Sequence, residues 1–269
     1  SGRTTPNTYA ERKSNKSGTD VCTEPCPAGF YCPGPYDTSA GQLPCPDPAK
    51  CAREGAVAPS GMLVCSFSDE TRGNYSVPSE GCRLTRMITL GSGDVLDVSG
   101  DSVATSASSS SSSSLFELQA IGGEPEETDP RRHFLVGVGA TLFLARVKMT
   151  HGRAIIVYSP LNERGGSVLV LGNLYADSVL FAGCGGTICA FAGGAVSSSG
   201  GSTVIKASTF QGNKAGSFAG ALYAEENAKV YVTSTVFKDN RAMGKGGAIM
   251  LEENAVLSLS GGNNVFIGN

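Results

Sequence analysis

The sequence predicts an all-β protein, a right-handed parallel β-helix (solenoid) with a small N-terminal disulfide-rich module. Three observations support this prediction: short phrases return at a fixed period, apolar residues alternate with polar ones between them, and cysteines concentrate near the N-terminus. The chain has 269 residues, enough for one extended domain and a small one.

Two phrases mark the period. A small-residue phrase, Gly193-Gly194-Ala195-Val196, opens one unit and recurs after 26 and then 27 residues. A Phe-x-x-Asn phrase closes each unit, and its Asn recurs after 27 and then 29 residues. Self-similarity at such a period is typical of a solenoid. The residues predicted to form structural ladders are Phe181, Phe210, Phe237 and Phe266, then Asn213, Asn240 and Asn269, and Gly194, Gly220 and Gly247.

The pattern inside each unit indicates strands. Lys229–Thr233 and Val256–Ser260 alternate polar and apolar residues, and each unit holds three such short runs. Three strands without a helix form one coil of a parallel β-helix, stacked about 4.8 Å from its neighbours. The Phe residues are expected to stack inside, and the Asn residues to occupy turns with left-handed φ and to bond through their side-chain amides. The Gly pairs are expected to supply positive φ at a tight corner.

Composition divides the chain into three parts. Residues 1–20 are polar and without periodicity, which predicts a linker or an extended arm. A cysteine-rich disulfide module is predicted over 21–82 and the β-helix over 83–269, with irregular first coils over 83–138 and regular coils over 139–269. The serine run Ser108–Ser114 is expected to be an exposed insertion. No polar cap follows the last coil, so we expect a longer chain or another segment to continue the stack.

Seven of the nine cysteines lie between Cys22 and Cys82, which indicates a disulfide framework and an oxidising compartment. Zinc is the competing interpretation, but the C-x2-C pairs that zinc clusters favour are missing. We expect Cys65 to pair with Cys82 and Cys184 with Cys189, and the odd total leaves one thiol over. The disulfide candidates are Cys22, Cys26, Cys32, Cys45, Cys51, Cys65, Cys82, Cys184 and Cys189.

Two sequons, Asn15-Lys16-Ser17 and Asn74-Tyr75-Ser76, make Asn15 and Asn74 candidates for glycosylation. Together with the cysteines they favour a secreted or cell-surface protein. No apolar run reaches the ~18 residues that a membrane span needs. A net charge of −3 gives no electrostatic case for nucleic acid as a partner.

Two resemblances extend this interpretation. The phrase from Cys26 to Gly34, CPAGFYCPG, resembles cysteine-rich modules of ephrin-receptor and growth-factor-receptor type. The stretch from Gly139 to Gly152 and the Gly-Gly-Ala and Phe-x-x-Asn phrases are similar to the chlamydial polymorphic outer-membrane protein repeat. That repeat also occurs in right-handed β-helix surface proteins of algae and other protists. The pairing implies a surface or extracellular protein of an alga or another protist, and members of the family are often adhesive.

An enzyme must also be considered, because pectate lyases and polygalacturonases use this fold with clustered Asp residues. Here the Asp residues are scattered, and His133 and His151 lack partners at motif spacing, so no catalytic, cofactor or metal site is predicted. Glu225-Glu226-Asn227 and Glu252-Glu253-Asn254 are expected to stack on one exposed turn. That turn is either a solvated surface or a weak calcium contact or interaction strip.

The predicted function is therefore that of a non-catalytic extracellular structural or surface protein. The β-helix would act as a rigid spacer or filament element and the cysteine-rich module as a joint. The alternatives are an adhesin that binds glycans or cell surfaces and, less favoured, a carbohydrate-active lyase or hydrolase. The predicted partners are other extracellular protein chains or further copies of this one, and glycans under the adhesin hypothesis. No cofactor, nucleic acid or membrane span is expected.

Overall fold

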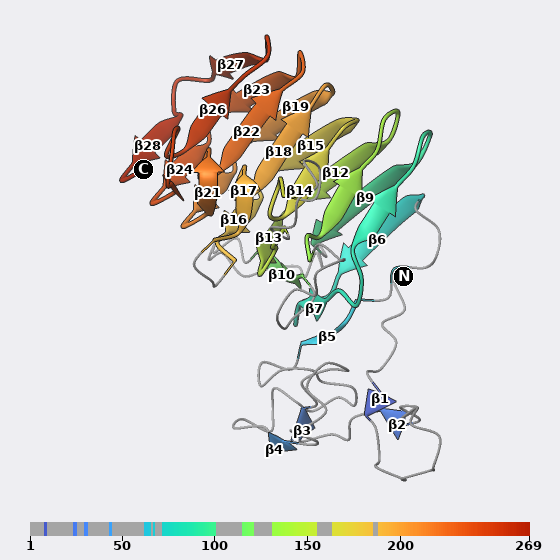
Figure 1. Cartoon of the computed structure of the whole chain (residues 1–269). Helices are drawn as coiled ribbons and strands as arrows, with labels where there is room; N and C mark the ends of the chain where they lie inside the picture. Colours follow the sequence, from blue (N-terminus) through green and yellow to red (C-terminus); the bar gives the residue numbers. More distant parts are fainter. Residues whose placement is uncertain are drawn as a thin grey trace, which may run out of the picture.

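The computed structural model describes residues 72–100, 115–120, 131–154, 163–184 and 188–269, together with 62–65, 67 and four two-residue strands nearer the N-terminus. Every regular element among them is a β-strand, and strands of successive coils lie side by side in parallel (Figure 1). The predicted fold class, an all-β parallel β-solenoid, is confirmed.

Three long parallel sheets and one short one form the solenoid. Sheet 1 contains β8 (Ile88–Leu90), β11 (Phe134–Val136), β14 (Val168–Val170), β18 (Val196–Ser199), β22 (Leu222–Glu225) and β26 (Ile249–Leu251). Sheet 2 contains β6 (Gly73–Val77), β9 (Val95–Gly100), β12 (Thr141–Ala145), β15 (Asn173–Asp177), β19 (Ser202–Lys206), β23 (Lys229–Thr233) and β27 (Val256–Ser260).

Sheet 3 contains β5 (Leu63–Val64), β7 (Cys82–Arg83), β10 (Phe116–Gln119), β13 (Val147–Thr150), β16 (Leu180–Ala182), β20 (Thr209–Gln211), β24 (Val236–Lys238) and β28 (Val265–Ile267). Sheet 4 contains β17 (Ala190–Ala192), β21 (Lys214–Phe218) and β25 (Arg241–Ala242). From β8 on, each coil runs through sheets 1, 2 and 3 in that order, and sheet 4 lies on the return to sheet 1. Two antiparallel pairs precede the solenoid, β1 (Thr8–Tyr9) with β2 (Glu24–Pro25) and β3 (Phe30–Tyr31) with β4 (Leu43–Pro44).

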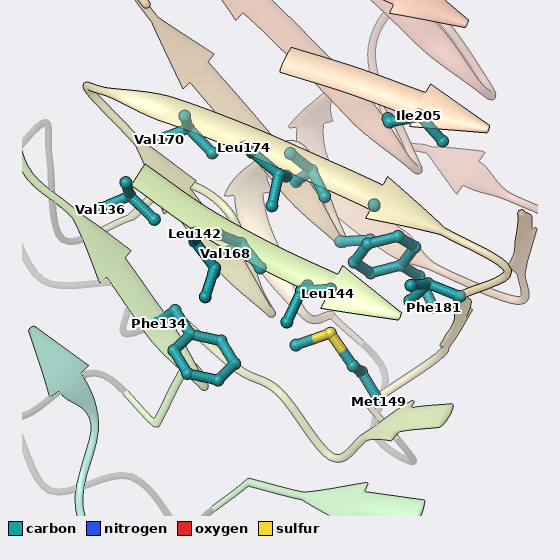
Figure 2. Packing of buried hydrophobic residues seen from close by; sticks show 14 of the residues in the cluster. Phe134, Val136, Leu142, Leu144, Met149, Val168, Val170, Leu174, Phe181 and Ile205 are labelled. Carbon is teal, nitrogen blue, oxygen red and sulfur yellow. The ribbon is translucent and has the colours of Figure 1, made fainter. Parts of the chain in front are cut away.

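Alternating residues of each strand point into the solenoid, and these inward side chains form the core. Leu142 and Leu144 of β12 are buried, whereas the alternate residues Thr141, Phe143 and Ala145 are not. Because the register is unbroken, inward side chains of neighbouring coils meet and form one continuous core along the stack. Figure 2 shows Leu142, Leu144 and Met149 pointing into the same interior.

The predicted phenylalanine ladder lies inside sheet 3. Phe181, Phe210, Phe237 and Phe266 follow one another in register, with ring centroids 4.5, 4.9 and 4.9 Å apart. The rings are within 11° of parallel, and the first three are fully buried. Each ring thus packs on the ring of the next coil as well as on the aliphatic core.

The asparagine ladder lies just beyond the phenylalanines. Nδ2 of Asn213 donates to Oδ1 of Asn240 at 2.9 Å and to the Phe181 carbonyl oxygen at 3.0 Å. Asn240 repeats this pattern one coil later toward Asn269 and Phe210. The expected amide ladder is therefore present, but the expected left-handed φ was wrong. Positive φ falls on the preceding residues, Gly212, Asp239 and Gly268, which make the turn and leave each Asn directed into the stack.

The small-residue corner has the positive φ expected of the Gly pairs, but at one position of each pair only. Positive φ falls on the first position of the phrase, at Gly193, Ala219 and Gly246. The second position needs space instead, because a Cβ on Gly194 would collide with the carbonyl oxygen of Gly220. A Cβ on Gly220 would collide in the same way with the Gly247 carbonyl, and one on Gly247 with the backbone of Asn269. The coils therefore pack backbone against backbone at this corner.

The solenoid begins before the predicted boundary at residue 83. β5 pairs with β7 in sheet 3, β6 pairs with β9 in sheet 2, and Tyr75 and Val77 are buried in the core. This segment was assigned to the cysteine-rich module because Cys65 and Cys82 lie on either side of it, although Gly73–Val77 is a strand of the solenoid. Asn15 and the serine run lie outside the described residues. So do five of the predicted disulfide cysteines, Cys22, Cys26, Cys32, Cys45 and Cys51.

Candidate functional site

The two histidines lie on different sides of the core boundary. His133 is fully buried just before β11, and its Nε2 donates to the Leu118 carbonyl oxygen at 3.0 Å. Burial lowers the pKa of His133 to about 4, so its ring is neutral at pH 7. His151 lies in the turn after β13 with φ of 64°, and its Nδ1 is 3.0 Å from Nε2 of Gln119.

The carboxylates lie in separate columns of the stack. Asp97 is in register with Phe143, whereas Asp177 is in register with Ala145 and pairs with Lys206 at 3.4 Å. Within the described ranges no three His, Cys, Asp or Glu residues are grouped so as to hold a metal ion. In the same residues no helix is long and apolar enough to cross a membrane.

The two glutamate turns stack as predicted, with the Asn227 amide donating to the Glu253 carbonyl oxygen at 2.9 Å. Glu226 and Glu253 are exposed, but the expectation of a wholly exposed turn was wrong for Glu225, which is only 2% exposed. The period could not show this burial, because the cation that covers Glu225 comes from a distant part of the chain.

That cation is Arg164, which forms an ion pair with Oε1 of Glu225. The Arg164 guanidinium also lies 5.5 Å from the centre of the Tyr223 ring. The Tyr223 hydroxyl donates to Oε2 of Glu225 at 3.0 Å and also contacts Oε2 of Glu252. Burial, followed by the hydrogen bond to Glu252, raises the pKa of Tyr223 well above its ordinary range. The phenol therefore stays protonated, and the cluster ties the outer side of sheet 1 to the corner that carries Arg164.

The outer face of sheet 2 carries several partly exposed aromatic side chains. Its middle column contains Phe143, Tyr175 and Tyr231, which are 37%, 40% and 44% exposed. The Phe143 and Tyr175 rings stack with centroids 4.9 Å apart and planes within 14°. Lys206 and Lys229 flank this column on the same face. Such a face offers aromatic surface bordered by charge.

A hollow of about 400 Å³ lies at the end of this column, next to Phe143. Its lining combines an aromatic ring, an aliphatic side chain, a carboxylate, an amide and a guanidinium, contributed by Phe143, Val95, Asp97, Asn74 and Arg72, with Gly73 and Gly93. Arg72 is held at the rim, where its Nε donates to Oδ1 of Asp94 at 3.2 Å. The arrangement suits a polar ring compound that has one apolar face.

Two of the predicted disulfides are formed. Cys65 is bonded to Cys82, which joins β7 of sheet 3 to the residue directly after β5. Cys184 is bonded to Cys189, at the corner between β16 and β17. Cys184 stands where the next coil has Asn213, so this bridge replaces one rung of the asparagine ladder.

Residues 234–252 match the Chlamydia polymorphic membrane protein (Chlamydia_PMP) repeat. The matched segment runs from the end of β23 through β24 and β25 to β26 and includes both recurring phrases. The repeat, set in a β-solenoid, is compatible with a surface role. Comparisons with curated proteins and with solved structures each gave no match.

Sequence reasoning missed the aromatic column and the hollow. Phe143 and Tyr175 are 32 residues apart, which exceeds the 26–29 of the regular units, so the period does not align them. The signal that could have found them is position within the strand. Each is the middle residue of a five-residue alternating strand, at the place that Tyr231 occupies in β23.

Proposed function

We propose that the protein is a non-catalytic surface or extracellular protein whose β-solenoid serves as a rigid spacer. The observation that carries this proposal is a polymorphic membrane protein repeat placed within a continuous parallel stack. A stack of this kind can hold other segments at a distance, because each coil contacts only its neighbours and the length grows coil by coil.

The physical case for a spacer is the continuity of the contacts along the axis. Each coil is bonded to the next through the backbone ladders of sheets 1, 2 and 3, and the later coils add the phenylalanine stack and the asparagine amides. The six strands of sheet 1 give a rod of about 24 Å. Bending this rod would break hydrogen bonds on one side, so it transmits position and orientation well.

The finer parts of the proposal concern the N-terminal region and the source. The residues that precede the solenoid are proposed to be a disulfide-bonded joint of ephrin-receptor-like type, and the source is proposed to be an alga or another protist. The cysteine density and the CPAGFYCPG phrase support the joint. Other extracellular chains or further copies of this chain are the proposed partners.

A surface location is tested by labelling intact source cells with a membrane-impermeant, amine-reactive reagent. Lys206 and Lys229, on the outer face of sheet 2, are the expected sites of modification. Labelling of these lysines before lysis supports the proposal, and labelling that requires lysis contradicts it. The proposal that the protein is non-catalytic is tested by incubating purified protein with pectin, alginate and chitin. Release of unsaturated or reducing sugar ends would overturn it.

A second candidate function, glycan binding by an adhesin, is favoured by the exposed aromatic column on sheet 2. Aromatic side chains on an open face are unusual for surfaces that contact only water and are frequent where ligands bind. Binding of the purified chain to immobilised glycans, lost in a Tyr175→Ala, Tyr231→Ala double variant, would support this function. Equal binding by the double variant would exclude the column as the adhesive surface.

A further inference from the structure

The hollow at the end of the aromatic column brings together three outward side chains from three consecutive strands. Asn74 of β6 is in register with Asp97 of β9, and Asp97 is in register with Phe143 of β12. Their strand neighbours Tyr75, Leu96 and Leu142 point into the core, so these three side chains point outward. All three line the hollow.

Phe143 presents one open aromatic face to this hollow. The Tyr175 ring covers the opposite face at 4.9 Å, on the side of the next coil. The order of the register places Asp97 and Asn74 on the uncovered side. Val95, 49% exposed, adds an apolar wall next to it.

Asn74 itself is accessible and belongs to the sequon Asn74-Tyr75-Ser76. It is exposed on β6, the end strand of sheet 2, and its side chain forms no hydrogen bond with any residue that the structure describes. The amide nitrogen is therefore free for modification, and a group attached to it starts inside the hollow.

We propose that Asn74 carries an N-linked glycan whose first N-acetylglucosamine residue lies in this hollow against Phe143. The inference rests on the proposed surface location, because the modification belongs to secreted chains. In the transfer, the Asn74 amide nitrogen attacks C1 of a lipid-diphosphate-linked oligosaccharide and loses one proton. The N–C1 bond forms, the bond from C1 to the diphosphate oxygen breaks, and the lipid diphosphate leaves.

The dimensions and the chemistry of the hollow fit this sugar. Asn74 and Phe143 are two strand spacings apart, about 10 Å, which a hexose attached to Nδ2 spans above Asp97. The C–H face of the sugar packs on the open ring, and its hydroxyl and acetamido N–H groups donate to the Asp97 carboxylate. Because the sugar is tethered, it occupies the hollow without the entropic cost of association from solution.

The test uses the full chain, fused to a secretion signal and expressed in a eukaryotic host. Mass spectrometry of the Asn74 peptide is expected to show the glycan. Asn74→Gln, which lacks it, is expected to melt roughly 2–4 °C lower than the glycosylated protein. The melting temperatures with and without Asn74→Gln are then compared in two Phe143 variants, Phe143→Ala and Phe143→Leu, the second of which keeps the site apolar. In both variants little or no difference is expected. On a Tyr231→Ala background, a matched exposed aromatic of the same column, the full difference is expected.

An unmodified Asn74 in folded, secreted protein would overturn the inference. So would a melting difference that is equally large without the Phe143 ring, since the sugar would then stabilise the chain without lying in the hollow. Neither result touches the spacer proposal, which the surface labelling of source cells tests separately.

Discussion

In the structure the first coils extend over residues 72–154, and the regular coils, which contain both recurring phrases, over residues 188–269. The two parts share the same three sheets but differ at one corner. In both parts the strands of sheets 1, 2 and 3 are parallel and in register from coil to coil. In the regular coils, the return from sheet 3 to sheet 1 contains the asparagine ladder, sheet 4 and the small-residue phrase. In the first coils, the return from β10 to β11 ends instead in two buried basic residues, Arg132 and His133.

The difference shows what the recurring phrases encode. The sheets need only alternation, because the first coils stack in register without either phrase. The phrases encode a corner at which turn residues, amide bonds and backbone contacts replace side-chain packing. The segment that matches the polymorphic membrane protein repeat, residues 234–252, covers this corner. We therefore expect the two parts of the rod to lose stability in response to different substitutions and conditions.

The largest expected effect is loss of a ladder ring. Phe237→Ala should lower the free energy of unfolding by about 3–5 kcal/mol, because a fully buried ring leaves a cavity. Phe134→Ala in the first coils removes an equally buried ring that meets Phe67 edge-on at 6.2 Å. Phe237 stacks at 4.9 Å on both sides, so its loss should cost about 1 kcal/mol more. Urea unfolding measures both, and equal costs would mean that stacking adds nothing beyond burial.

The second effect is a sensitivity to acid that originates at His133 in the first coils. The pKa of His133, about 4 in the folded state, lies below the unfolded value near 6.5. Between these values the unfolded chain binds a proton that the folded chain does not, so stability falls as pH falls from 6.5 to 4. The loss amounts to about 3 kcal/mol and is absent above pH 6.5. The amides of the asparagine ladder do not titrate, so they contribute no comparable loss of stability between pH 6.5 and 4.

Unfolding of His133→Gln across this pH range should show a shallower decline than the parent protein, because glutamine cannot take up the proton. His151→Gln is the comparison variant. Partial burial lowers the pKa of His151 too, but this residue lies in an exposed turn, so a smaller change in the decline is expected than for His133→Gln. Hydrogen exchange at pH 4.5 should increase first around residues 131–136. Earlier exchange in the asparagine ladder, or identical slopes for parent and His133→Gln, would contradict the assignment.

The sequence was sufficient for the stack and insufficient for its corners. Alternation and period identify three strands per coil, the inward Phe237 and the bonded Asn240. They do not tell which of two adjacent small residues carries the positive φ, because Gly193 and Gly194 both lack a Cβ. Only the position of the next coil shows that Gly194 needs space. The hollow beside Phe143 depends on strand register across coils of unequal length, which local pattern does not contain.

The smallest of these effects tests the space requirement directly. Gly220→Ala places a Cβ against the Gly247 carbonyl and the Arg241 backbone, so the coils must separate, at a cost of about 2 kcal/mol. Gly91→Ala in the first coils is the matched control, because its nearest atom is a flexible Asp94 oxygen 3.6 Å away. Thermal unfolding should show a clear loss for Gly220→Ala and almost none for Gly91→Ala. If Gly220→Ala is tolerated, the regular corner is held by its turns and amides, and close backbone approach is only their consequence.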